Sequence, residues 1–173
     1  MAVVWAPQDA RDRPHGKSAA TARPRLAMEI RMKPVSELLK RHDGTLWHVR
    51  PDDTVFAALE VLASRGVGAL MVMEGGQLVG VFSERDYTRK IVLRGRDSKL
   101  TRVAQIMTQE IISATAETGI RDCMALMSRS KIRHLPVLKG GSVLGMISIR
   151  DIMDDIIADH EATIANLENY IKF

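Results

Sequence analysis

The chain has 173 residues, 46% of them apolar, which suffices for one compact domain or two small ones and excludes a disordered or fibrous protein. Residues 1–33 hold seven Lys/Arg against three Asp/Glu, which accounts for the whole net charge of +4. The remainder has 25 − 7 = 18 basic and 21 − 3 = 18 acidic residues, so it lacks the basic excess that is typical of a nucleic-acid-binding domain.

Residues 1–33 predict a flexible tail, because Pro, Gly, Ser, Ala and Arg are mixed there without periodicity. A transit peptide is the alternative, since the segment is rich in Arg, but Asp9 and Asp12 argue against it. Met28 and Met32 are further candidate start residues. No apolar run reaches the roughly 18 residues of a membrane-spanning helix, and we predict a soluble, cytoplasmic protein.

The pattern becomes regular from residue 34 onward. In chain order it predicts a short helix at 34–41, an extended segment at 45–51, a helix at 52–66, two strands within 68–82 and a helix at 83–95. Thr54 is the expected N-cap of the second helix. Gly75 and Gly76 form the expected hairpin turn between the two strands.

The same elements occur twice in the chain. An offset of 145 − 80 = 65 residues aligns 49–86 with 114–151 without a gap, and it matches both glycines of the hairpin turn and the buried face of the helix. Upstream the register slips by three residues, so that VSELL at 35–39 matches VAQIM at 103–107. The chain is therefore predicted to be a tandem duplication.

The duplication gives a first half-domain at 34–98 and a second at 99–160, which can share one core across a pseudo-twofold axis. The residues from 151 to the end predict one long helix, which continues as an extension at 161–173. A seam with seven-residue spacing runs along it and comprises Ile157, Ile164 and Ile171, with His160 and Leu167 between them. This seam packs either on the chain's own core or against a second subunit.

A seven-residue signature ends each repeat, GVFSERD at 80–86 and GMISIRD at 145–151. In both copies a serine precedes an aspartate by three residues, which is the spacing of a capping box and needs no ligand. The residues concerned are Ser83 and Asp86 in the first copy and Ser148 and Asp151 in the second.

The arginines of the signature are not explained by a cap. Arg85 and Arg150 fall in a first helical turn, where the helix dipole disfavours a cation. An anion at the helix start would account for them, because free backbone N–H groups, a serine hydroxyl and a guanidinium group together bind phosphate. The aspartate could then accept two hydrogen bonds from a ribose diol. Ribose and phosphate together indicate a nucleotide.

The paired signatures, with SRSKIRHLPVL at 128–138 entering the second hairpin, resemble those of the cystathionine-beta-synthase (CBS) domain. Their tandem arrangement over residues 34–160 resembles a CBS pair, or Bateman module, of the kind found in short stand-alone bacterial two-CBS proteins. The resemblance implies an α/β (α+β) fold of two pseudo-twofold-related half-domains, each a small sheet with flanking helices.

The resemblance also implies a function. CBS pairs are regulatory modules that bind AMP, ADP or ATP, and S-adenosylmethionine or NAD in some members. They sense energy or redox state and signal to a partner protein through a conformational change. They commonly form homodimers, so the resemblance favours a subunit contact for the long C-terminal helix.

Individual roles can be assigned from the same resemblance. Ribose binding falls on Asp86 and Asp151. Contacts to phosphate or ribose fall on the remaining polar residues of the signatures, Ser83, Arg85, Ser148 and Arg150. The backbone at 67–70 and 132–135 is expected to face the base.

The two copies differ where the first hairpin strand begins. The second copy has Lys131, Arg133 and His134, whereas the matching residues 66–69 of the first copy hold no cation. Family members often hold phosphate with basic residues at this place, so these three residues join the predicted nucleotide site, in one of the two clefts. The alternative for His134 is a hydrogen-bonded histidine at a strand edge. A metal site is not predicted, because no second ligand stands at a suitable spacing.

The sequence gives less support to two other classes of function. Residues 89–102 hold six Lys/Arg and one Asp, which makes nucleic-acid binding the alternative function, but the aromatic content of 4% offers few residues for stacking on bases. An enzyme is not predicted, because no nucleophile elbow, P-loop or dinucleotide-binding motif occurs. The only cysteine, Cys123, is expected to be a core residue.

Overall fold

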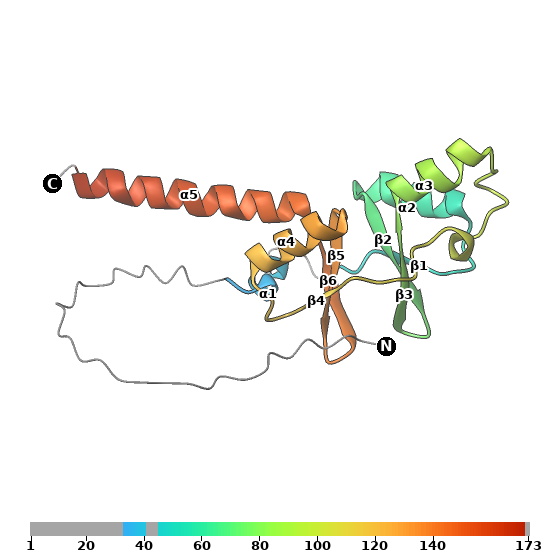
Figure 1. The fold of residues 1–173 in the computed structure, drawn as a ribbon, viewed down its shortest axis with the longest axis horizontal. Helices are drawn as coiled ribbons and strands as arrows, with labels where there is room; N and C mark the ends of the chain where they lie inside the picture. The colour runs from blue at the N-terminus through green and yellow to red at the C-terminus, as the bar shows by residue number, and fades with distance from the viewer. Residues whose placement is uncertain (1–32, 41–44, 172–173) are drawn as a thin grey trace, which may run out of the picture. The chain divides into compact units, whose positions relative to one another are not determined.

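The computed structural model describes residues 33–40 and 45–171. The predicted tail lies outside the described residues apart from Lys33. The first repeat forms α1 (Val35–Leu39), β1 (His48–Val49), α2 (Val55–Arg65), β2 (Ala69–Glu74), β3 (Gln77–Ser83), α3 (Glu84–Lys90) and a 3₁₀ turn, η1 (Val92–Arg94). The second forms η2 (Val103–Gln105), β4 (Ala114–Thr115), α4 (Ile120–Ser130), β5 (His134–Lys139), β6 (Ser142–Ser148) and α5 (Ile149–Ile171) (Figure 1).

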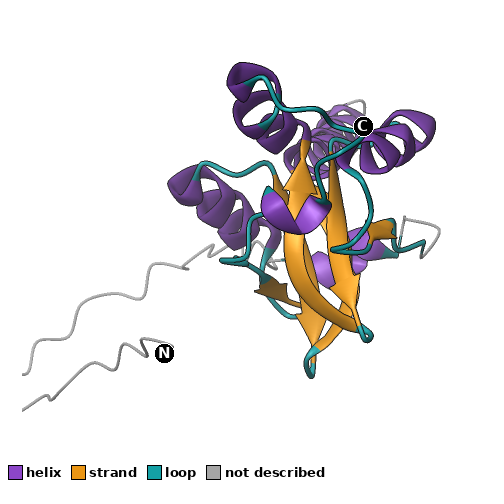
Figure 2. Cartoon of the chain, turned by 90° about the vertical axis from the view of Figure 1, so that its right-hand side faces the viewer, coloured by secondary structure: helices purple, strands orange, loops and turns teal. Residues whose placement is uncertain are grey.

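Each repeat carries one three-stranded sheet. The strand order is β1-β2-β3 in the first and β4-β5-β6 in the second, with one parallel and one antiparallel pairing in each. Figure 2 shows the two long hairpins with helices around them. The predicted α/β fold of two small sheets with flanking helices is confirmed.

The offset of 65 residues also holds for the structure. Helix α4, strand β5 and strand β6 begin and end 65 residues after α2, β2 and β3. Val72 pairs with Gly80 and Val137 with Gly145, and the register shifts directly after both valines. Thr54 caps α2 through a hydrogen bond from the Ala57 amide, so the predicted N-cap is confirmed. The predicted helix at 83–95 is shorter: α3 ends at Lys90, Val92–Arg94 form the separate η1 turn, and Gly95 ends that turn in a left-handed conformation.

Each hydrophobic core includes a short helix from the segment that precedes the other repeat. Val35 and Leu38 of α1 lie in the core of the second repeat, whereas Val103 of η2 lies in that of the first. The backbone contacts match: the Val35 amide donates to the Thr118 carbonyl oxygen at 2.8 Å, and the Val103 amide donates to the Asp53 carbonyl oxygen at 2.9 Å. The two repeats are therefore tied together through both cores. Cys123 is fully buried in the second core, as predicted, and its burial raises the thiol pKa to about 11.

The exchanged segments, α1 and the residues directly after η2, explain the glycine that opens each signature. A Cβ on Gly80 would lie 2.7 Å from Met107 Sδ and 3.2 Å from the Thr108 carbonyl oxygen, and one on Gly145 would lie 2.8 Å from Leu39 Cδ2. Gly80→Ala should therefore destabilise the fold by about 1 kcal/mol, as measured by urea denaturation. Gly145→Ala should cost less, because only the end of a leucine side chain must move. The reverse order would contradict this packing.

Helix α5 leaves the second core after its first two turns. Ile152 is buried, whereas every residue from Ile157 to Ile171 is exposed. Lys33 forms a 2.7 Å ion pair with buried Asp155 and lies 3.8 Å from Asp159. Figure 1 shows the rest of the helix projecting beyond α4, so the predicted seam does not pack on the chain's own core. No helix in the described residues is both long and apolar enough to cross a membrane.

Candidate functional site

Both signatures form the predicted capping boxes. The Ser83 amide and hydroxyl donate to Asp86 Oδ2 at 3.1 and 2.6 Å, and Ser83 Oγ accepts from the Asp86 amide at 3.3 Å. The corresponding three distances between Ser148 and Asp151 are 2.6, 2.8 and 3.2 Å. In each pair the cap uses one carboxylate oxygen. These bonds fix both aspartates at the point where a strand meets a helix.

A cleft of about 640 Å³ opens beside the second signature. This volume lies in the range of small-molecule sites, roughly 300–1,000 Å³. We call it the Asp151 cleft, and its lining is formed by Thr45, Trp47, Leu62, Ala63, Gly66, Val67, Gly68, Ala69, Met71, Glu84, Arg133, His134, Met146, Ile147, Ser148, Ile149, Arg150 and Asp151. The site therefore combines the signature of the second repeat with strands and a helix end from the first.

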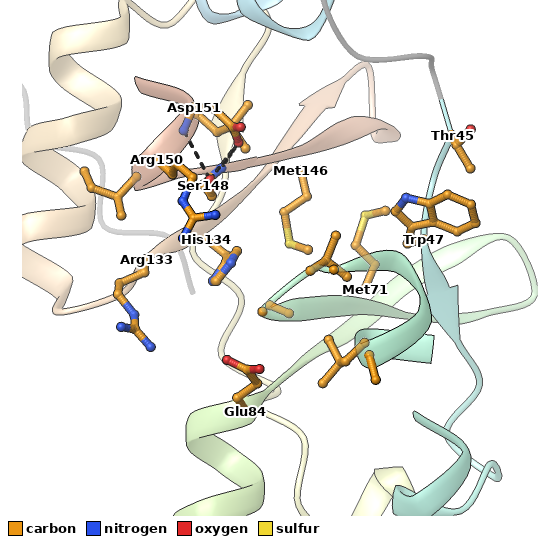
Figure 3. A pocket seen from close by; sticks show the side chains of 18 residues that line it. Thr45, Trp47, Met71, Glu84, Arg133, His134, Met146, Ser148, Arg150 and Asp151 are labelled. Carbon is orange, nitrogen blue, oxygen red and sulfur yellow. Dashed lines mark hydrogen bonds between the residues drawn. The ribbon is translucent and has the colours of Figure 1, made fainter. Parts of the chain in front are cut away.

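The Asp151 cleft contains five of the nine predicted site residues. Ser148, Arg150 and Asp151 come from the end of β6 and the start of α5, whereas Arg133 and His134 precede and begin β5. Figure 3 shows Trp47 and Thr45 on the side of the cleft opposite Arg150 and Asp151. An aromatic ring across the cleft from a serine, an arginine and an aspartate suits a ligand with a flat base at one end and polar groups at the other.

The other four predicted residues do not line this cleft. Arg85 Nη1 donates to the Lys131 carbonyl oxygen at 2.6 Å, which ties the first signature to the end of α4. Asp86 Oδ1 lies 2.8 Å from Lys90 Nζ and 3.4 Å from Thr108 Oγ1, so both oxygens of this carboxylate have partners. The basic cluster predicted from the sequence is divided, because Arg133 and His134 line the Asp151 cleft and Lys131 does not.

Lys131 has a conformational role in addition to its charge. It terminates α4 with φ 54°, where its counterpart Gly66 terminates α2 with φ 64°. A lysine in this left-handed conformation is strained by its Cβ. The difference between the copies at this place is therefore backbone strain at Lys131 as well as a cation.

The charge of the cleft is balanced. Burial, and secondarily Arg133, lowers the pKa of His134, although Asp151 and Glu84 act in the opposite direction. The imidazole is thus neutral near pH 7, and two guanidinium groups, Arg133 and Arg150, face two carboxylates, Glu84 and Asp151. Of the predicted basic cluster, only Arg133 is a permanent cation at this cleft, where the sequence suggested up to three; the second cation, Arg150, belongs to the signature.

The lowered pKa of His134 predicts how stability depends on pH. An unfolded histidine has a pKa of about 6.5, so the stabilising contribution of the neutral ring is present above this pH and declines as the pH falls toward the folded value. Glutamine does not titrate. When the pH is lowered from about 7.5 to about 5, the free energy of unfolding of His134→Gln should therefore fall less than that of the wild type. Equal losses in urea denaturation would show that His134 does not titrate differently on folding.

The comparisons with known proteins agree with this architecture. The CBS domain family matches residues 35–93 and 103–158, more than half of the chain. The chain belongs to the CBS-domain family. CBS-domain pairs are generally regulatory modules that bind adenosine ligands. The resemblance of the two signatures to this family is therefore confirmed.

Individual relatives show how far this CBS pair resembles known ones. The mitochondrial CBS domain-containing protein CBSX3 of Arabidopsis thaliana is 40% identical over 138 residues, which cover 77% of this chain and 67% of that protein. A solved protein with CBS domains from Burkholderia ambifaria MC40-6 is 42% identical and has a TM-score of 0.71, over 73% of this chain and 96% of its own. A hexameric CBS-CP12 protein from bloom-forming cyanobacteria is 25% identical, with a TM-score of 0.63, over 78% of this chain and 86% of its own.

Two residues of this CBS pair were not predicted as part of a site. Glu84 occupies a variable position of the first signature. An acidic residue in a first helical turn is already explained by its favourable interaction with the helix dipole. Trp47 lies in an extended segment of unremarkable pattern, and the Arg65 guanidinium lies 4.0 Å from the centroid of its ring. Both reach the Asp151 cleft from the first repeat, so only the pairing of the repeats reveals them. Among the described residues, no group of three or more His, Cys, Asp and Glu could hold a metal.

Proposed function

We propose that this CBS pair is a regulatory module that binds an adenine nucleotide in the Asp151 cleft. The observation that carries the proposal is the arrangement of Trp47 across from Ser148, Arg150 and Asp151 in a cleft of nucleotide size. The face of the Trp47 ring that Arg65 does not cover is the proposed contact for the base. The carboxylate offers an acceptor for the ribose diol, and Arg133 and Arg150 offer donors for phosphate.

AMP is the nucleotide that the charges of this cleft favour. Two carboxylates offset its two guanidinium groups, so each phosphate beyond the first adds repulsion that no further permanent cation compensates. ADP, ATP and NAD are the competing ligands. Binding, and not turnover, is the proposed role, so the nucleotide should be recovered unchanged after incubation with the pure protein.

A thermal-shift panel of adenosine, AMP, ADP, ATP and NAD tests this function. A ligand at about 100 times its Kd stabilises the folded state by roughly 2.7 kcal/mol, so AMP should raise the melting temperature clearly, more than adenosine or ATP does. No shift with any of these compounds would contradict the proposal. A shift with NAD or ATP alone would keep the nucleotide site and correct the ligand.

We infer that the regulatory form is a homodimer that changes conformation on binding and is read by a partner protein. The exposed seam of α5 supports a subunit contact, and the hexameric CBS-CP12 relative supports assembly in this family. Light scattering measures the molar mass in solution, which should be that of a dimer. The contacts of residues 89–102 do not favour the nucleic-acid alternative. Lys90 donates to the Ile106 carbonyl oxygen and forms an ion pair with Asp86, and Arg102 donates to the Asp52 carbonyl oxygen.

A further inference from the structure

The projecting part of α5 has an apolar face that the rest of the chain does not cover. Between 49% and 84% of the surface of Ile157, Ile164, Leu167 and Ile171 is exposed. With His160, these residues occupy the alternating three- and four-residue spacing of a helix–helix seam. A helix face of this kind is stable in water when another surface covers it.

A row of carboxylates runs beside this seam. Asp154, Glu161 and Glu168 recur every seventh residue and therefore lie along one line of the helix. Between Asp151 and Ile171 the sequence contains no lysine or arginine. The surface that covers the seam must therefore be apolar and carry positive charge along one side.

A surface with these properties lies on the first repeat. Val92, Leu93 and Leu100 are exposed over 53%, 75% and 81% of their area. Four cations lie near them in the sequence, and none forms an ion pair within the described part of the chain: Arg89, Arg94, Arg96 and Lys99. Lys99 instead lies 5.0 Å above the Phe56 ring, which is itself partly exposed. We call these residues the η1 patch.

Pairing of α5 with a second α5 fits the charges less well. An antiparallel pair would bring the two rows of carboxylates together. A parallel pair would bury His160 against its own copy and leave the carboxylate rows without cations. The η1 patch of a second copy matches both the apolar seam and the acidic row.

We propose that residues 157–171 of α5 dock on the η1 patch of a second copy of this chain. When α5 of each copy docks on the η1 patch of the other, the two equivalent contacts form a dimer with twofold symmetry. The proposal names the contact surface of the homodimer inferred above, and it is separate from nucleotide binding because none of these residues lines the Asp151 cleft.

Charge exchange tests the contact. The variant Glu161→Lys/Glu168→Lys should raise the Kd of the dimer at least about tenfold, as measured by analytical ultracentrifugation. Arg94→Glu/Arg96→Glu should do the same. Mixing the two variants should give a heterodimer, because both reciprocal contacts then join opposite charges, and the combined four-site variant should again form a homodimer. Glu110→Lys/Glu117→Lys, with the same change of charge at exposed sites elsewhere, should leave the dimer intact.

The outcomes separate this contact from the other proposals. Loss of the dimer in the α5 variant without rescue by the patch variant would overturn the contact and favour pairing of two α5 helices. Dimers of wild-type strength in both double variants would also overturn it, as would a monomeric wild-type protein. Circular dichroism verifies that each variant is folded. Calorimetry with AMP on the same variants tests the nucleotide site independently, because its residues are unchanged.

Discussion

Replacing Asp151 with asparagine should weaken AMP binding by about 1.5–3 kcal/mol, or roughly 10- to 150-fold. The amide oxygen of asparagine can still accept from the Ser148 amide, so the cap survives. Its NH₂ group then replaces the carboxylate oxygen that would accept from the ribose, and a donor faces a donor. Isothermal titration calorimetry measures the change in Kd.

The matched control is Asp86→Asn, which makes the same substitution in the other capping box, outside the Asp151 cleft. It should leave AMP binding at this cleft unchanged. Dideoxy-AMP lacks the diol, so a double-mutant cycle can combine this change in the ligand with Asp151→Asn in the protein. The wild type should prefer AMP over dideoxy-AMP, and Asp151→Asn should bind the two almost equally. A preference that survives in the variant would show that Asp151 serves only as a cap.

Arg133→Ala should weaken AMP binding by about 1.5 kcal/mol while changing adenosine binding little. A guanidinium group forms charge-assisted hydrogen bonds with phosphate. Adenosine has no phosphate, so its binding does not depend on these bonds. The exposure of Arg133 keeps the expected loss near the lower end for such bonds, because water screens the charge. Calorimetry with both ligands on both proteins gives the difference directly.

Arg129→Ala is the matched control, since Arg129 is an exposed arginine of α4 four residues earlier that does not line the cleft. It should bind both ligands as the wild type does. Equal losses for AMP and adenosine in Arg133→Ala would mean that Arg133 shapes the strand entry and does not contact phosphate.

The repeat and its elements could be predicted because each depends on local pattern. The offset of 65 residues, the Thr54 cap and the two capping boxes follow from residue spacing alone, and the structure reproduces each of them. The exchange of α1 and η2 between the cores could not be predicted in this way. The three-residue slip between VSELL and VAQIM was visible, but hydrophobic periodicity does not say which core a short helix joins.

The candidate site shows the same division. Ser148, Arg150 and Asp151 could be found because they lie within seven consecutive residues. Trp47 and Glu84 lie 104 and 67 residues before Asp151 in the sequence and reach its cleft only through the packing of the two repeats. The pKa of His134 likewise depends on burial and on charges from both repeats, so sequence spacing carried no information about its charge.

The crystal structure of the protein with AMP tests the central claim most directly. We expect the ribose diol within hydrogen-bonding distance of Asp151, the phosphate beside Arg133 or Arg150, and the adenine against Trp47. AMP bound away from the Asp151 cleft, or a cleft that stays empty at saturating AMP, would contradict the proposed function.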